Sequence, residues 1–196
     1  MRYLITLLVV LSVTVSFGIL QYESADTVGA GRFGISAGGT MSLASFYGGG
    51  FGLEYGLFDF LSVGFKGDSF YTHSGNSSIF SHSFGLNLKG NYDFAGSPFL
   101  VSLSLGGEYY EHKTSGWEDT IDGDYYTNYR KGFGAKGSLA LQAWFVYAGI
   151  SLHESNYGFA PGFVGLDIKF CDYFSLYVEF GGQLFAGMSL GLEFSF

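Results

Sequence analysis

Three carboxylates in the second half of the chain are spaced closely enough to share a cation. Asp119, Asp122 and Asp124 lie in an acidic stretch, residues 111–128, that also contains Trp117. Carboxylate oxygens are the ligands that calcium takes in proteins. Their spacing does not follow that of a calcium-binding loop, so the favoured interpretation is a solvated loop. We predict no metal and no cofactor there, and an acidic, aromatic surface open to an extracellular ligand.

A second group of residues carries the chemistry of an ester hydrolase. The run His153-Glu154-Ser155-Asn156 is similar to the His-x-Ser-Asn signature of the lipid A 3-O-deacylases, a family of small outer-membrane barrels. The resemblance implies Ser155 as nucleophile, His153 as general base and Asp167 as the acid that orients it. That family has Glu at the acidic position, a triad nearer the C-terminus and eight strands. The favoured interpretation is therefore a histidine at a strand end, followed by a Ser-Asn turn.

The chain that carries these residues begins with an apolar segment. Arg2 precedes an apolar run over residues 4–15, and small residues follow it. This order is typical of a secretory signal peptide, whereas an uncleaved membrane anchor needs about 20 apolar residues. We predict residues 1–18 as a signal peptide and residues 19–196 as a single domain. After residue 18 no apolar run is long enough for a membrane-spanning helix, which leaves a closed β-barrel as the spanning structure.

The composition excludes several classes of protein. Of the 196 residues, 32 are glycine, 22 phenylalanine and 15 tyrosine, and 47% are hydrophobic, which excludes a disordered chain. Cys171 is the only cysteine, which excludes an internal disulfide and a cysteine-rich metal site. The formal net charge is −8, and the sequence has no basic patch or glycine-rich phosphate loop. Nucleic acid is therefore not an expected partner.

The last ten residues alternate between apolar side chains and small or polar ones. A period of two residues is expected of a strand with a lipid face and a lumen face, and a helix cannot produce it. The apolar residues Leu190, Leu192, Phe194 and Phe196 resemble the C-terminal signal of bacterial outer-membrane barrels. The resemblance implies that the barrel-assembly machinery recognises this strand.

The same alternation recurs along the chain and predicts ten strands, with eight as the alternative. Turns are required near Ala143 and Gly182, because the segments that contain them are too long for one transmembrane strand. We therefore predict an all-β fold, a transmembrane antiparallel up-and-down β-barrel in the bacterial outer membrane, with both termini periplasmic. The predicted strands cover residues 28–38, 51–57, 61–66, 80–93, 99–110, 129–142, 144–153, 163–170, 174–182 and 187–196.

Charged residues occupy the polar face of these predicted strands. If that face points inward, the lumen holds six acids and six bases. Buried charges are tolerated when they are paired, so this matched set predicts a network of ion pairs inside the barrel. Arg32 on the first strand and Glu193 on the last are expected to pair where the barrel closes. The predicted lumen charges are Arg32, Glu54, Lys66, Asp68, Lys89, Glu108, Arg130, Lys136, Asp167, Lys169, Glu179 and Glu193.

The rest of the lumen decides between a plug and a pore. The other inward positions are mostly glycine and serine, which fill little volume, and ten strands enclose a wider lumen than eight. A sealed barrel is favoured, with a narrow pore constricted by the charges as the alternative. We predict a structural, surface-adhesive or narrow-pore role in contact with outer-membrane lipid, with a deacylase-like ester hydrolase as the competing function.

Overall fold

The chain forms a closed antiparallel barrel of ten strands. The computed structural model describes residues 25–42, 46–74, 76–117, 125–153, 162–181 and 187–196, so the predicted signal peptide lies outside the described residues. Neighbouring strands pair in sequence order, and β1 closes the barrel on β10. This confirms the predicted fold and ten strands rather than eight. The strands are β1 Phe33–Ser42, β2 Phe46–Phe58, β3 Leu61–Ser74, β4 Ser77–Asp93, β5 Phe99–Trp117, β6 Tyr125–Ala143, β7 Val146–His153, β8 Gly162–Cys171, β9 Phe174–Gly181 and β10 Gly187–Ser195.

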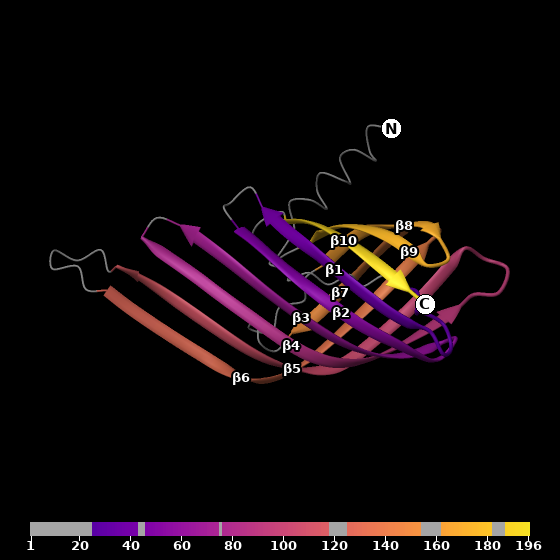
Figure 1. The fold of residues 1–196 in the computed structure, drawn as a ribbon, viewed down its shortest axis with the longest axis horizontal. Helices are drawn as coiled ribbons and strands as arrows, with labels where there is room; N and C mark the ends of the chain where they lie inside the picture. The colour runs from indigo at the N-terminus through magenta and orange to yellow at the C-terminus, as the bar shows by residue number, and fades with distance from the viewer. Residues whose placement is uncertain (1–24, 43–45, 75, 118–124, 154–161, 182–186) are drawn as a thin grey trace, which may run out of the picture.

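Short turns join the strands at one end of the barrel, which we call the turn end. Two-residue turns lie at residues 59–60, 144–145 and 172–173. The C-terminus and the start of β1 lie at this end as well (Figure 1). The turn predicted near Ala143 is confirmed, with Trp144 in a left-handed conformation at φ 57°.

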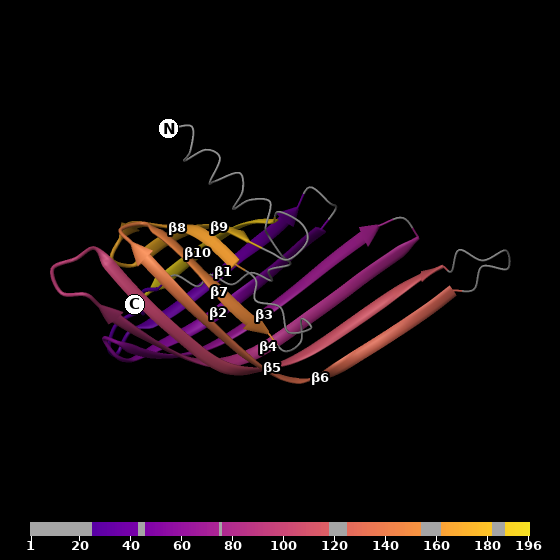
Figure 2. The same cartoon turned by 180° about the vertical axis from the view of Figure 1, so that it is seen from behind.

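The strands differ strongly in length. β5 and β6 have 19 residues each, whereas β7 and β9 have 8. At about 3.4 Å per residue and a tilt of about 45°, a strand as long as β5 covers roughly 45 Å along the barrel axis. An outer-membrane barrel needs an apolar band of only about 25 Å. β4, β5 and β6 therefore form a tall wall that extends beyond the shorter strands at the end opposite the turns (Figures 1 and 2).

The prediction of a loop over residues 111–128 is wrong for most of that range, because it belongs to the two long strands of the tall wall. Residues 111–117 belong to β5 and residues 125–128 to β6. The two strands stay in register from Glu111 opposite Lys131 to Trp117 opposite Tyr125. Continuous backbone pairing extends the hairpin, although its acidic composition is typical of a loop. Residues 118–124, with Asp119, Asp122 and Asp124, lie outside the described residues.

The two faces of the barrel have opposite chemistry. Large apolar side chains are exposed on the outside, up to 84% for Phe133, and the apolar residues of the predicted assembly signal on β10 are among them. The inward face is polar, with Ser62, Ser81 and Ser151 almost fully buried. No helix among the described residues is long and apolar enough to cross a membrane. The buried apolar cluster is small and lies near the turn end, where it consists of Ala25, Ala140, Tyr147, Phe163 and Tyr177.

The first strand starts later than predicted. β1 begins at Phe33, whereas the alternation predicts a strand over residues 28–38. Gly29 and Gly31 have φ values of 81° and 72°, a left-handed conformation that glycine adopts without strain and that does not fit a strand. The chain before β1 therefore leaves the sheet.

Candidate functional site

Residues 25–31, which we call the strap, lie across the turn end of the barrel. Ala25 is fully buried, and its amide nitrogen donates to Gln142 Oε1 at 2.9 Å. Val28 is 7% exposed and lies against the backbone of β1, where a Cβ added at Gly34 would be 2.6 Å from Val28 Cγ1. The strap is thus packed into the mouth of the barrel.

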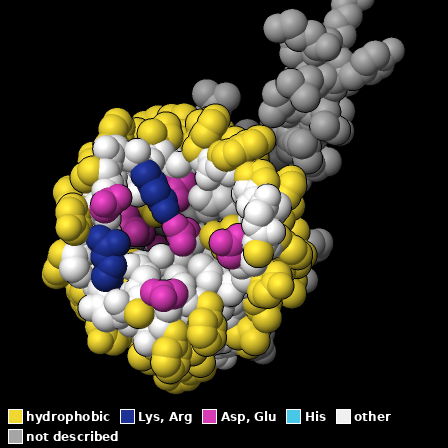
Figure 3. All heavy atoms as spheres, turned by 90° about the vertical axis from the view of Figure 1, so that its right-hand side faces the viewer, with side chains coloured by type: hydrophobic (Ala, Val, Ile, Leu, Met, Phe, Trp, Pro, Cys, Tyr) yellow, Lys and Arg dark blue, Asp and Glu magenta, His cyan; other side chains and the backbone are white. Residues whose placement is uncertain are grey.

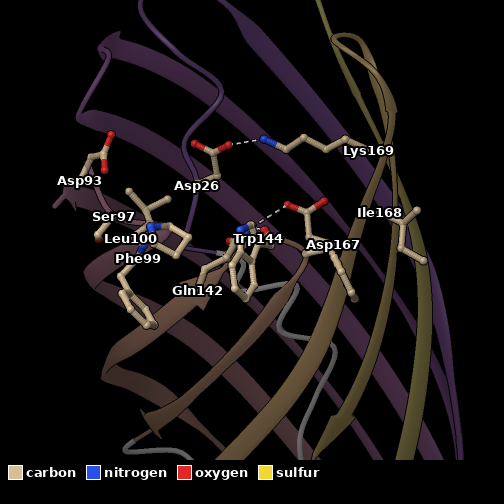
Figure 4. Close-up of a pocket in the computed structure, with 12 residues that line it drawn as sticks. Asp26, Asp93, Ser97, Phe99, Leu100, Gln142, Trp144, Asp167, Ile168 and Lys169 are labelled. Atoms are coloured by element: carbon tan, nitrogen blue, oxygen red, sulfur yellow. Dashed lines mark hydrogen bonds and ion pairs between the residues drawn. The ribbon is translucent and has the colours of Figure 1, made fainter. Parts of the chain in front are cut away.

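Two lysines from opposite walls hold the strap at Asp26. Lys89 Nζ on β4 donates to the Asp26 backbone oxygen. Lys169 Nζ on β8 forms an ion pair with the Asp26 carboxylate (Figure 4). Because these contacts come from different strands, they tie the strap across the mouth rather than to one side.

The turn between β2 and β3 fixes the middle of the strap. Thr27 Oγ1 donates to the Asp59 carbonyl at 2.8 Å, and the Ala30 amide donates to Asp59 Oδ1 at 3.1 Å. Asn91 Nδ2 donates to Thr27 Oγ1 at 3.3 Å. The pattern of the sequence did not predict Asp26, Asn91 or Gln142 as site residues, and it placed Gly29 and Gly31 in a strand, although two closely spaced glycines could have indicated a bend.

The mouth is hollowed on both sides of Asp26. One cavity of about 820 Å³ reaches toward the turns that precede β5 and β7, and another of about 200 Å³ lies toward β9 and β10. Asp26, Asp167 and Lys169 line both cavities. Figure 3 looks into this end of the barrel, where acidic and basic side chains lie in a hollow inside a ring of hydrophobic ones.

Several predicted lumen acids near the mouth bind neutral donors. Tyr147 donates to Glu179 Oε2 at 3.0 Å, and Tyr177 donates to Glu193 Oε2 at 3.1 Å. Gln142 Nε2 donates to Asp167 Oδ2 at 3.4 Å (Figure 4). The inward face is therefore partly a hydrogen-bonded interior, in which each of these carboxylates has a neutral donor on one oxygen, while Asp167 Oδ1 is buried without a hydrogen-bond partner.

Other predicted charges lie along the same inward face. Glu54 Oε1 accepts from Ser62 at 2.6 Å, and Glu54 Oε2 lies 3.9 Å from Lys89 Nζ. The guanidinium of Arg130 lies 5.7 Å from the ring centre of Tyr110. The inward positions of β3 to β6 also carry Lys66, Asp68, Glu108 and Lys136, which take part in further interactions.

The expected pair between Arg32 and Glu193 does not form. Arg32 donates to the Asp172 carbonyl at 2.9 Å, and its guanidinium lies over the ring of Tyr173. Because Arg32 precedes β1, its side chain lies at the rim of the mouth and not on the inward face of a strand. In the register of β1 and β10, Glu193 is opposite Ser36.

The structure does not bring the predicted hydrolase residues together. The Asp167 amide donates to the carbonyl of Phe145, at the turn-end start of β7. His153 is the last residue of β7, eight residues further along. At about 3.3 Å per residue, the backbones of these two residues are roughly 26 Å apart. Ser155 lies outside the described residues, and Asp167 points into the lumen.

No group of three His, Cys, Asp or Glu residues within the described ranges is arranged to hold a metal ion. The positive charges at the mouth are instead those of Lys89 and Lys169, which bind Asp26. These contacts can hold the strap in place across the lumen.

Comparisons with known proteins find likeness in structure only. No protein family model matches the sequence, and no curated protein matches it. The chain is similar to the KdgM porin in complex with disordered oligogalacturonate, at 15% identity and a TM-score of 0.45, over 83% of this chain and 99% of that one. It is similar to the outer membrane protein OprG from Pseudomonas aeruginosa, at 12% identity and a TM-score of 0.43, over 87% and 99%. It is also similar to the N-terminal β-barrel domain of Pseudomonas aeruginosa OprF, at 16% identity and a TM-score of 0.41, over 86% and 99%. At these identities the likenesses carry no inference about function.

Proposed function

We propose that the protein is an integral outer-membrane barrel whose lumen is closed at the periplasmic end by the strap, so that it anchors a surface structure and does not conduct solutes. The observation that carries the proposal is the burial of the strap in the mouth, where Ala25 is fully buried and Asp26 is bonded to Lys89 and Lys169. A chain segment held from two walls blocks the passage that the small inward side chains leave open.

The outer surface supports the membrane location. Exposed apolar patches larger than a few hundred Å² are rare on soluble monomers, whereas a transmembrane barrel needs an apolar band all round. Aromatic girdles mark the two edges of such a band, and the edge with short turns is periplasmic in this class of barrel. The exposed aromatic residues at the turn end include Phe58, Phe60, Tyr92, Trp144, Phe170 and Tyr173.

The tall wall supports the surface role. Its strands are longer than a bilayer requires, so their upper parts stand above the apolar band. A closed barrel holds this wall at a fixed height and orientation. The proposed role is therefore structural or adhesive, with the upper part of the wall as the surface that faces outward.

Conductance measurements on a strap-displacing variant test the proposal. A Cβ at Gly56 would overlap the carbonyl group of Gly29, so Gly56→Ala should push the strap out of the mouth. We expect no channels from the wild-type protein in a planar bilayer, and discrete current steps from the variant.

The matched control is Gly90→Ala near the same end. A Cβ there would be 3.8 Å from the nearest atom, the Phe60 carbonyl oxygen. The strap should therefore stay in place, and we expect no current steps from this variant. Heat-modifiable gel migration establishes that each variant is folded. Steps of equal size from the wild type and both variants would contradict a closed lumen.

A further inference from the structure

The tall wall carries charged side chains on its outer face, which the other strands lack within the described residues. Across all ten strands, the charged residues at outward positions are Glu111, Lys113 and Lys131. The register places His82 opposite Glu111 and Glu111 opposite Lys131, so these residues form one row across β4, β5 and β6. Lys113 lies one outward position higher on β5. We call His82, Glu111, Lys113 and Lys131 the outer charged row.

An aromatic row lies directly below these charges. Phe84, Tyr109 and Phe133 are cross-strand partners one outward position closer to the turn end. The rings of Tyr109 and Phe133 are 5.2 Å apart, and Phe133 is highly exposed. No charged side chain occupies an outward position of β4 to β6 between this row and the turn end, within the residues that the structure describes.

The height of the outer charged row matches the edge of a bilayer. Lys131 lies twelve residues from Ala143, the turn-end residue of β6. At about 3.4 Å per residue and a tilt of about 45°, this separation is roughly 29 Å along the barrel axis, slightly more than the apolar band of about 25 Å on an outer-membrane barrel. In a membrane the row therefore lies at the depth of the lipid headgroups.

Glu111 is already satisfied within the row. The Tyr109 hydroxyl donates to Glu111 Oε1 at 2.5 Å, and His82 Nε2 lies 3.0 Å from Oε2. Both carboxylate oxygens therefore have a partner within the row, and the carboxylate orients the Tyr109 and His82 side chains.

The two lysines keep their charge available. Lys131 Nζ lies 5.7 Å from the ring centre of Tyr129. Lys113 is exposed and has no ion pair with any described residue. With Glu111 counted, the row has a net charge of about +1, although the whole chain is at −8. An anion at headgroup depth fits this arrangement, and acyl chains fit the aromatic row below it.

We propose that Lys113 and Lys131, with His82 beside them, bind the phosphate headgroup of an anionic membrane lipid whose acyl chains lie along Phe84, Tyr109 and Phe133. The inference rests on the proposed membrane location of the barrel. It assigns the tall wall a lipid site on its outer face, separate from the strap and the lumen.

Native mass spectrometry of the full folded chain tests the site. The barrel is released from detergent micelles containing either phosphatidylglycerol or phosphatidylcholine, and the bound lipid is counted over a lipid titration. We expect the wild type to retain phosphatidylglycerol in preference to phosphatidylcholine. Lys113→Gln combined with Lys131→Gln should weaken that retention about thirtyfold, from about 1 kcal/mol for each basic residue near a membrane surface.

Arg130→Gln is the matched control for Lys131→Gln. The two residues are adjacent on β6 and carry the same charge, but Arg130 faces inward over Tyr110. The inference is supported if only Lys131→Gln weakens retention. It is overturned if both variants weaken it equally, or if the wild type does not discriminate between the two lipids. Failure of the folded barrel to insert into vesicles would instead contradict the proposed membrane location.

Discussion

Replacing Lys89 by methionine is expected to lower the free energy of unfolding of the barrel by about 3–5 kcal/mol. Lys89 is 4% exposed, and its Nζ lies between Glu54 and the backbone oxygen of Asp26. Methionine fills similar space without the charge, so the carboxylate of Glu54 loses its cation and the Asp26 oxygen loses its donor. Urea titration, followed by the gel migration of unheated samples, measures the change.

A second substitution separates the charge from the packing. Glu54→Gln in the Lys89→Met background removes the uncompensated carboxylate while leaving Ser62 a partner, so part of the lost stability should return. The double variant is expected to unfold at a higher urea concentration than Lys89→Met alone. If Lys89→Met has the midpoint of the wild type, the lysine neither stabilises the Glu54 carboxylate nor holds the strap at Asp26.

The part of the barrel near the turn end was predictable from the sequence, because one face of each strand there lines the polar lumen and the other is apolar. A strand between a polar lumen and an apolar exterior must alternate, and β10 does so from Met188 to Ser195. Two-residue turns add a second constraint, since a segment such as residues 129–153 is too long for one strand. The turn after Ala143 follows from these two facts, and together they favour ten strands over the alternative of eight.

The upper part of the tall wall was not predictable from that pattern. Above the apolar band both faces of a strand are polar, so Glu111, His112 and Lys113 follow one another and the alternation disappears. A polar run of this kind is typical of a loop. The outer charged row was missed for the same reason, because its members become neighbours only through the register of β4, β5 and β6.

The strap and the hydrolase residues show what spacing along the chain cannot reveal. Asp26 contacts Lys89 and Lys169, which are 63 and 143 residues away in the sequence. The short spacing between His153 and Asp167, in contrast, places their backbones toward opposite ends of the paired strands β7 and β8. Which end of a barrel a residue reaches depends on strand direction and register.

Replacing Gly165 by valine is expected to destabilise the barrel by about 1–3 kcal/mol through overpacking. Tyr147 on β7 is directly opposite Gly165 on β8, and a Cβ at Gly165 would overlap the tyrosine ring. The ring has little room to move, because Tyr147 is 1% exposed and its hydroxyl donates to Glu179. Heat-modifiable migration over a urea series measures the loss.

A double-mutant cycle tests whether the two residues act as one packed unit. Tyr147→Ala alone should cost about 3–5 kcal/mol, because it empties a buried aromatic site and removes the donor to Glu179. In the Tyr147→Ala background, the side chain introduced by Gly165→Val no longer clashes with a ring and partly fills the empty space. The loss of stability caused by Gly165→Val should therefore vanish, or the substitution should become stabilising. Additive losses would show that the ring does not pack over Gly165. A strong coupling would establish that the packing of Tyr147 on β7 over Gly165 on β8 stabilises the barrel next to the strap.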